Sequence, residues 1–462
     1  MKLPDEFIEQ LRGLLPDEWE KLAAAITSSE PSVSVRVNEA RGVGVPQGSR
    51  RVPWCGQGFY LADRPTFTFD PGWHAGQYYV QDASSMFIAH VVSHFVHEPV
   101  RYLDLWAAPG GKPTAAMQAL PQGSLVVANE IVPPRARVLA DNVIRWGNPR
   151  CVVTSNAPAH LGRFNDFFDV IATDVPCSGE GMMRKDDEAV GQWSPTLVKQ
   201  CAQRQREILA GVWPALRPGG LLIYSTCTYN RQENEEIADF IVQELGAESL
   251  EVPIEASWNI HPAIDSNCRC YRFMPHRVDG EGLFMAVFRK SGNGSRQDVR
   301  VKEKNAKKVD EIGRNWLSCP DEYTIGQLGD LLVAVPQDIQ REVAALRSSL
   351  NVLHAGVELA TVMGRKTVPH HALAMSLARA EDAFPSCEVD YPTALRYLRG
   401  ESISVDAPRG HVLISHERAV LGIANNLGNR ANNLYPKPLR ILSTHVPAEK
   451  PLVLHRASAD CR

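Results

Sequence analysis

The chain has 462 residues, of which 44% are hydrophobic and 22% are charged, with a formal net charge of −4. This composition supports sizeable apolar cores and excludes a wholly disordered or fibrous chain, and the length predicts about three domains. Every apolar run is broken well short of the roughly 18 residues that a membrane-spanning helix needs. The N-terminus also lacks the apolar stretch of a signal peptide. We therefore expect no membrane association and a cytoplasmic location.

The predicted elements begin with mixed helical and strand patterns over residues 1–95. Between residues 96 and 290, short apolar runs alternate with helical patterns, which is typical of βαβ units around a parallel sheet. The expected strands are 100–105, 124–130, 168–174, 216–228 and 282–290, with the last two as an antiparallel pair. Helical periodicity then runs through 337–380, and a strand-and-turn region begins at about 390.

Positive charge is concentrated in two C-terminal segments. Residues 291–310 hold six basic and three acidic residues with almost no apolar content, which predicts a flexible basic linker, here bounded at 291–318. A solvated connector without a partner is the alternative. From Tyr391 to Arg462 there are ten basic against five acidic residues, a balance that suits contacts with phosphate groups.

The first motif is Asp104-Leu-Trp-Ala-Ala-Pro-Gly-Gly-Lys112, which follows an expected strand and opens a helix. Small residues at such a turn let a ligand approach the backbone N–H groups. Glu130 ends the next strand, where an acidic side chain commonly binds ribose hydroxyls. The motif therefore favours a nucleoside-containing cofactor, with a plain structural turn as the alternative. It is not the GxGxxG pattern of a dinucleotide dehydrogenase.

Two cysteines follow two other expected strands. Cys177 lies in Asp174-Val-Pro-Cys-Ser-Gly-Glu-Gly, and Cys227 lies in Tyr224-Ser-Thr-Cys-Thr-Tyr-Asn. Open α/β sheets place ligands at the carboxyl ends of their strands. A buried, inert cysteine is the commoner fate of either residue alone, but two at one sheet edge beside a cofactor turn indicate chemistry. No CxxC pair occurs among the ten cysteines, so we expect reduced thiols and no metal site.

Together, the segments DLWAAPGGKP, DVPCSGEGMMRKD, STCTYNRQENE and PHRVDGEGLFMAVFRK resemble the Nop/Sun family of RNA cytosine-5 methyltransferases. Further segments, among them VRVN (35–38), GQYYVQDASSM (76–86) and NLYPKPLR (433–440), resemble the bacterial 16S ribosomal RNA branch of that family, RsmF. The resemblance covers most of the chain.

The resemblance implies that a cysteine adds to carbon 6 of a cytosine so that carbon 5 can attack a methyl sulfonium. By the matching motifs, Cys227 is the nucleophile and Cys177 helps to remove the carbon-5 proton. Asp174 is expected to bind the polar edge of the base and to border the cofactor. Lys112 is a candidate positive neighbour that favours the thiolate.

The implied cofactor is S-adenosylmethionine. It is expected over Ala107, Ala108, Pro109, Gly110, Gly111, Lys112 and Pro113, with Glu130 at the ribose. Arg135 matches a basic position of the family, and Asn156 stands at the position that faces the adenine.

The implied fold is α/β: a Rossmann-like methyltransferase core with an N-terminal α+β domain and a C-terminal PUA-like region. The expected domains are an RNA-binding domain at 1–95, the catalytic domain at 96–290, the linker, and a C-terminal region at 319–462 with the PUA-like module at about 390–445.

The expected partner is RNA, either 16S ribosomal RNA or the small ribosomal subunit, and the chain is assumed to be a monomer. The expected target lies in the decoding region. Methylation of tRNA and a non-catalytic role in ribosome assembly are the alternatives, and methylation of a small metabolite is a distant fourth.

Overall fold

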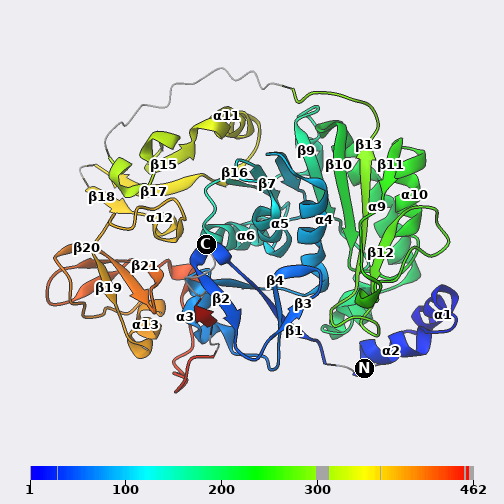
Figure 1. Cartoon of the computed structure of the whole chain (residues 1–462), viewed down its shortest axis with the longest axis horizontal. Coiled ribbons are helices and arrows are strands. Elements are labelled where there is room, and N and C mark those ends of the chain that lie inside the picture. The colour runs from blue at the N-terminus through cyan, green and yellow to red at the C-terminus, as the bar shows by residue number, and fades with distance from the viewer. Residues whose placement is uncertain (1, 29, 298–311, 365, 452–453, 457–462) are drawn as a thin grey trace.

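A computed structural model describes residues 2–28, 30–297, 312–364, 366–451 and 454–456. Figure 1 shows a central sheet with helices on both faces, flanked by an N-terminal region and two smaller C-terminal sheets. Within the described ranges, no helix is both long and apolar enough to cross a membrane. Residues 298–311 of the expected basic linker lie outside the described ranges, so its flexibility stays a prediction.

The central sheet has nine strands. They run in the order β11-β13-β10-β9-β6-β7-β8-β16, and β12 also pairs with β13. The parallel strands are β6 (Arg101–Asp104), β7 (Leu125–Asn129), β8 (Cys151–Thr154), β9 (Phe168–Asp174) and β10 (Leu216–Thr226). The antiparallel strands are β11 (Ala247–Leu250), β12 (Cys270–Phe273), β13 (Leu283–Lys290) and β16 (Val352–Ala355). The Rossmann-like α/β class and the antiparallel pairing of β10 with β13 are confirmed.

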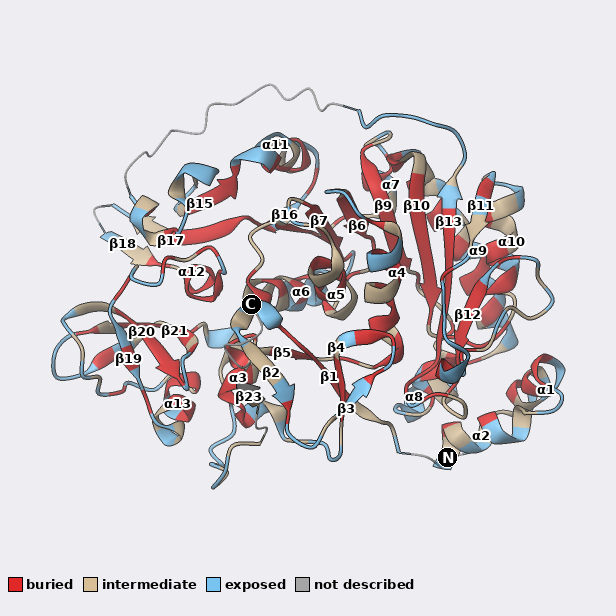
Figure 2. Cartoon of the chain, in the orientation of Figure 1, coloured by how far each residue is buried: buried red, intermediate tan, exposed pale blue. Residues whose placement is uncertain are grey.

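Alternating side chains of this sheet pack into two separate cores, because successive residues of a strand point to opposite faces. In β7, Val126 packs with α4 (Phe87–Phe95), α5 (Gly111–Ala119) and α6 (Pro133–Trp146). Its neighbour Val127 packs with the helices of the other face. Those helices are α9 (Pro195–Val212), α10 (Glu235–Gln243) and α11 (Gln340–Ser349). Figure 2 shows the strands of this sheet as mostly buried.

The N-terminal region contacts the catalytic sheet in two places. The helices α1 (Asp5–Leu14) and α2 (Trp19–Ser28) share a core with Met183, Trp193 and Tyr229 of the catalytic region. A four-stranded sheet follows, in the order β3-β4-β1-β5. Its strands are β1 (Val33–Val37), β3 (Arg50–Val52), β4 (Cys55–Leu61) and β5 (Tyr78–Val80).

The prediction of helical structure over 337–380 is wrong for the middle of that range. Only α11 and α12 (His371–Met375) are α-helical there, and the residues between them form β16, β17 (Val357–Met363) and β18 (Lys366–Pro369). The last two strands join β14 (Tyr323–Leu328) and β15 (Leu331–Pro336) in a separate sheet. Strand β16 instead extends the central sheet beyond β8. Pairing with distant strands overrides the local helical pattern.

The second C-terminal sheet runs in the order β19-β20-β21-β22 and packs against α13 (Tyr391–Leu398). Its strands are β19 (Ser386–Glu388), β20 (Gly410–His416), β21 (Ala419–Asn426) and β22 (Ala431–Asn433). Phe69 and Ala75, from either side of α3 (Pro71–His74), share its core, so this module is docked on the N-terminal region.

Candidate active site

The two strand-end cysteines meet in the structure. Strands β9 and β10 are parallel neighbours, with Asp174 opposite Ser225 in the register. The segments that leave these strands bring the sulfur atoms of Cys177 and Cys227 to 3.2 Å from each other. Both residues are partly exposed, unlike most of the other cysteines within the described ranges. The predicted juxtaposition of two cysteines at one sheet edge is therefore present.

The two thiols share a hydrogen bond in which either sulfur can be the donor. The hydrogen bond to Cys227, burial and a negative charge on Cys227 all raise the pKa of Cys177 well above the ordinary value. The raised pKa favours the protonated, neutral form of Cys177. A thiol held protonated beside a second sulfur can relay a proton while its neighbour acts as a nucleophile.

Asp174 and Lys112 form an ion pair beside the cysteines. The Lys112 ammonium lies 2.8 Å from Oδ2 of Asp174, and the Ser225 hydroxyl donates to Oδ1 at 3.0 Å. Burial is the largest single influence and opposes the charge on Lys112, but the hydrogen bond and the negative charge of Asp174, together with Asp104, raise the pKa of the lysine. A negative charge on Cys227 acts in the same direction. The positive charge of Lys112 therefore interacts electrostatically with Cys227.

The segment from Ala107 to Pro113 includes the turn between β6 and α5 and the first residues of α5, as the motif predicts. Gly110 precedes the helix with a φ of +121°, a conformation that a residue with a side chain rarely adopts. Pro113 lies in the first helical turn, where a backbone N–H has no partner within the helix, so the missing N–H costs little. The Asn142 amide donates to the carbonyl of Pro109 at 2.6 Å and fixes the turn from outside.

Two buried carboxylates beside this turn keep an unused acceptor. One oxygen of Glu130 accepts the N–H of Val132 at 3.0 Å, whereas Oε2 has no hydrogen bond to the described residues. Arg135 lies 3.5 Å from that oxygen and also donates to the carbonyl of Ala108. Oδ2 of Asp104 is likewise buried and unpaired. Burial raises the pKa of Asp104 to about 7, against the influence of Lys112.

These oxygen atoms, which accept no hydrogen bond from the described residues, fit the cofactor that the fold implies. S-adenosylmethionine carries ribose hydroxyls and an ammonium group, which are the donors that buried carboxylate oxygens need. The assignment of Glu130 to the ribose stays a prediction. Asp104 is a further candidate that the sequence interpretation did not assign, although an acidic residue at the start of the glycine-rich motif was the available signal.

Asn156 is engaged with the C-terminal region. Its amide donates to the carbonyl of Asn351 at 3.1 Å, and its carbonyl accepts the N–H of Asn351 at the same distance. Its own backbone N–H donates to the Asn129 side chain. In this structure the side chain therefore fastens the segment before β16 to the segment after β8, and its contact with adenine stays a prediction.

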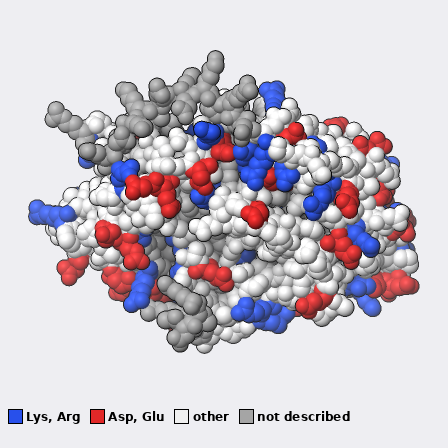
Figure 3. All heavy atoms as spheres, turned by 45° about the horizontal axis from the view of Figure 1, so that its top comes forward, with Lys and Arg blue, Asp and Glu red and all other residues white. Residues whose placement is uncertain are grey.

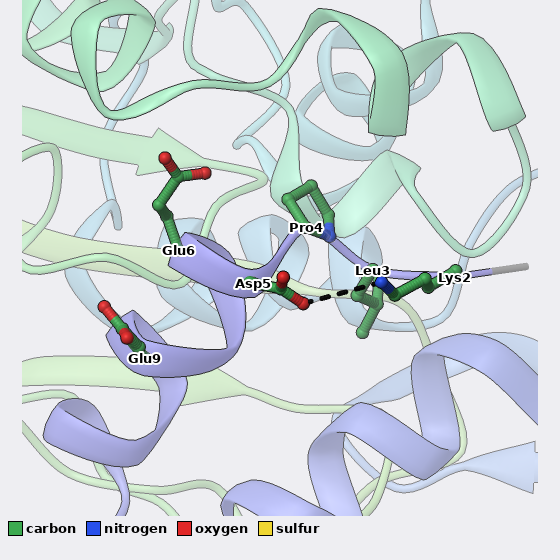
Figure 4. Close-up of a pocket in the computed structure, with 6 residues that line it drawn as sticks. All are labelled: Lys2, Leu3, Pro4, Asp5, Glu6 and Glu9. Atoms are coloured by element: carbon green, nitrogen blue, oxygen red, sulfur yellow. Dashed lines mark ion pairs between the residues drawn. The ribbon is translucent and has the colours of Figure 1, made fainter.

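Other groupings of polar residues lie elsewhere. A hollow at the start of α1 is lined by Lys2, Leu3, Pro4, Asp5, Glu6 and Glu9, as Figure 4 shows, and Lys2 and Asp5 lie 3.7 Å apart. Figure 3 shows acidic and basic side chains interspersed over the face that it presents. Among the residues that the structure describes, no group of three or more side chains could hold a metal ion.

Family models match most of the chain. The model for the 16S rRNA methyltransferase RsmB/F matches residues 95–289, and the model for the N-terminal domain of 16S rRNA methyltransferase RsmF matches 3–83. The model for the methyltransferase RsmF PUA domain matches 384–441.

Two relatives named ribosomal RNA small subunit methyltransferase F show how far the similarity extends. The protein of Serratia proteamaculans is 30% identical over 410 residues, which cover 84% of each chain. The protein of Erwinia tasmaniensis is 28% identical, with 94% of this chain and 96% of the relative covered.

Two solved structures from Pyrococcus horikoshii share the fold. A methyltransferase homologue has a TM-score of 0.53 and 25% identity, and covers 62% of this chain and 95% of its own. The protein NSun6, solved with the S-adenosylmethionine analogue SFG, has a TM-score of 0.54 and 19% identity, and covers 63% of this chain and 99% of its own.

Proposed function

Since this chain belongs to the RsmF family of 16S ribosomal RNA methyltransferases, we propose that it methylates carbon 5 of a cytosine in the decoding region of that RNA. It is an S-adenosylmethionine-dependent ribosomal RNA methyltransferase with a PUA domain. The observation that carries the proposed chemistry is the pair of sulfur atoms 3.2 Å apart at the carboxyl ends of β9 and β10. A ribosomal substrate also implies a cytoplasmic location.

The proposed reaction uses the pair in sequence. The Cys227 thiolate adds to carbon 6 of the base, which makes carbon 5 electron-rich enough to attack a methyl group. S-adenosylmethionine supplies that methyl group as a sulfonium electrophile. Loss of the carbon-5 proton to a base that Cys177 positions then breaks the bond between carbon 6 and the Cys227 sulfur, which leaves as a thiolate. The Cys177 thiol is adjacent to the sulfur that departs, which supports this role.

Asp174 and Lys112 support the same chemistry. In the proposal, Asp174 binds the polar edge of the cytosine, while Lys112 holds the carboxylate in place and stabilises negative charge at Cys227. The ion pair at 2.8 Å and the raised pKa of Lys112 support both assignments. A base in a duplex cannot reach these groups, so the target is flipped out or already unpaired.

We assign RNA binding to the flanking regions, with residues 1–95 and the module at about 390–445 as the contact domains. Arg430 and Lys437 are exposed on that module, whereas Arg396 is paired with Glu401. The nearly full-length similarity to ribosomal RNA methyltransferases favours ribosomal RNA over tRNA. An RNA-binding assembly factor without activity would not need both cysteines, the ion pair and the unused carboxylate acceptors.

The experiment that tests this proposal offers labelled S-adenosylmethionine with small ribosomal subunits, naked 16S RNA and total tRNA in parallel. Digestion and mass spectrometry then locate 5-methylcytosine. We expect label in the decoding region of 16S RNA. Label in tRNA alone would exclude the ribosomal substrate, and binding of the cofactor without label in any RNA would favour the assembly factor.

A further inference from the structure

Glu180 lies three residues after Cys177, and its carboxylate is completely buried. It reaches the segment that carries the other cysteine. Oε2 accepts the backbone N–H groups of Tyr229 and Asn230, at 2.6 and 2.9 Å, two and three residues after Cys227. One carboxylate oxygen in the segment of Cys177 thus holds the backbone of the segment that follows Cys227.

The other oxygen of Glu180 binds three side chains. Oε1 accepts from the Gln10 amide of α1 at 2.8 Å, from the Trp193 indole at 3.1 Å and from the Asn230 amide at 2.9 Å. Through the bond to Gln10, helix α1 also contacts the joint, by which we mean the contacts of Glu180 and Gly181 that connect the segments of Cys177 and Cys227. With the two backbone N–H groups, the carboxylate accepts from five donors.

A direct backbone contact reinforces this joint. The N–H of Gly181 donates to the carbonyl of Cys227 at 2.7 Å. A Cβ atom on Gly181 would lie 2.6 Å from that same oxygen, so only glycine allows the two segments to approach so closely. The residue next to Glu180 therefore touches the cysteine that the proposed reaction uses as its nucleophile.

We infer that Glu180 is a positioning residue for methyl transfer, which holds the segment of Cys177 against the segment of Cys227. The effect of Glu180 on methyl transfer rests on the proposed function, whereas its effect on the placement of the two thiols rests on geometry alone. Glu180 touches neither sulfur, so it acts through the two segments. Because all five partners are donors, an amide in place of the carboxylate would turn its NH2 group toward donors in either orientation.

The test compares E180Q with the wild type in thiol cross-linking, without RNA. Diamide removes two electrons and two protons from the thiols, so that they form one disulfide and diamide becomes a hydrazine. Peptide mass spectrometry then follows the Cys177–Cys227 product. We expect cross-linking in E180Q to be at least tenfold slower, because the sulfur atoms are no longer held together. E188Q, which alters an exposed glutamate of the same segment, is the control and should match the wild type.

Methyl transfer provides the second readout. In E180Q we expect kcat to fall at least tenfold while the KM for S-adenosylmethionine stays within twofold, since the cofactor turn is not part of this joint. E180D retains the charge but shortens the side chain, and should slow cross-linking at least threefold. If E180Q fails to bind the cofactor, E180D decides the question.

Cross-linking within twofold of the wild type in E180D, or in an E180Q that binds the cofactor, would overturn the inference. If the wild type methylates no RNA but E180Q still slows cross-linking, the proposed function fails and the positioning role stands.

Discussion

At the scale of single residues, Glu130 and Asn156 have different roles although each lies just beyond the end of a parallel strand in the catalytic sheet, β7 and β8 respectively. Glu130 has a buried oxygen without a hydrogen bond to the described residues. The side-chain amide of Asn156 donates one hydrogen bond to Asn351 and accepts another from it. We expect Glu130→Gln to weaken S-adenosylmethionine binding about tenfold, the equivalent of roughly 1.4 kcal/mol, because a charge-assisted hydrogen bond is lost. The unfolding free energy should change little.

Asn156→Ala is the matched variant and should behave in the opposite way. It removes two hydrogen bonds that fasten the C-terminal region, at a cost of about 1–2 kcal/mol in unfolding free energy. Calorimetric titration of the cofactor and denaturant unfolding of both variants separate the two roles. Weaker cofactor binding with unchanged stability in Asn156→Ala would instead place this residue at the adenine.

Residues at strand ends could be predicted from the sequence because a parallel sheet gathers them at one edge. That rule brought Cys177, Cys227 and Asp174 together, with Lys112 from the glycine-rich turn. The same rule says nothing of Glu180, whose five donors come from segments distant in the sequence, so only the folded structure reveals its position.

At the scale of elements, the predicted strands β6, β7, β9, β10 and β13 are confirmed because each is a distinct apolar run. Strand β8 was not among the strands predicted from apolar runs. Strand β16 was hidden in an apparently helical segment, since its pairing with β8 joins residues about two hundred positions apart. Local periodicity carries no information about such a partner, which is why the C-terminal addition to the sheet was not foreseen.

At the scale of the whole molecule, the N-terminal region and the C-terminal module form one interface. The Tyr391 hydroxyl donates to the carbonyl of Phe69 at 3.0 Å, and Nδ1 of His74 lies 2.9 Å from the Tyr435 hydroxyl. His371 stacks edge-on against the same tyrosine. The module that carries the proposed RNA contacts is thus fixed to the N-terminal region through α3, as Figure 1 shows.

This interface should make the protein sensitive to acid. Burial lowers the pKa of His74 to about 4 and of His371 to about 3. Below the ordinary pKa of 6.5, the two histidines bind protons in the unfolded chain but stay neutral in the folded chain. The free energy of unfolding therefore falls as the pH decreases from about 6.5 toward 4. Each histidine contributes about 1.4 kcal/mol per pH unit to this slope.

Denaturant unfolding at pH 7.0, 6.0 and 5.0 measures this slope. His371→Phe removes one of the two titrating groups, and also an unpaired buried nitrogen, while keeping a planar ring in the site. We expect its stability to depend less steeply on pH than that of the wild type. Equal slopes in both proteins would show that His371 is not held neutral by the fold.

The central claim, that Cys227 forms a covalent bond with the base and that Cys177 is needed to resolve it, is tested most directly by trapping the adduct. Cys177→Ala and Cys227→Ala are incubated with 16S RNA and S-adenosylmethionine, with Cys319→Ala, which alters an exposed cysteine, as the control. Denaturing gels then reveal protein bound covalently to RNA. We expect the adduct to accumulate in Cys177→Ala and to be absent from Cys227→Ala, while Cys319→Ala behaves as the wild type. An adduct in Cys227→Ala and none in Cys177→Ala would contradict the account and reverse the two roles.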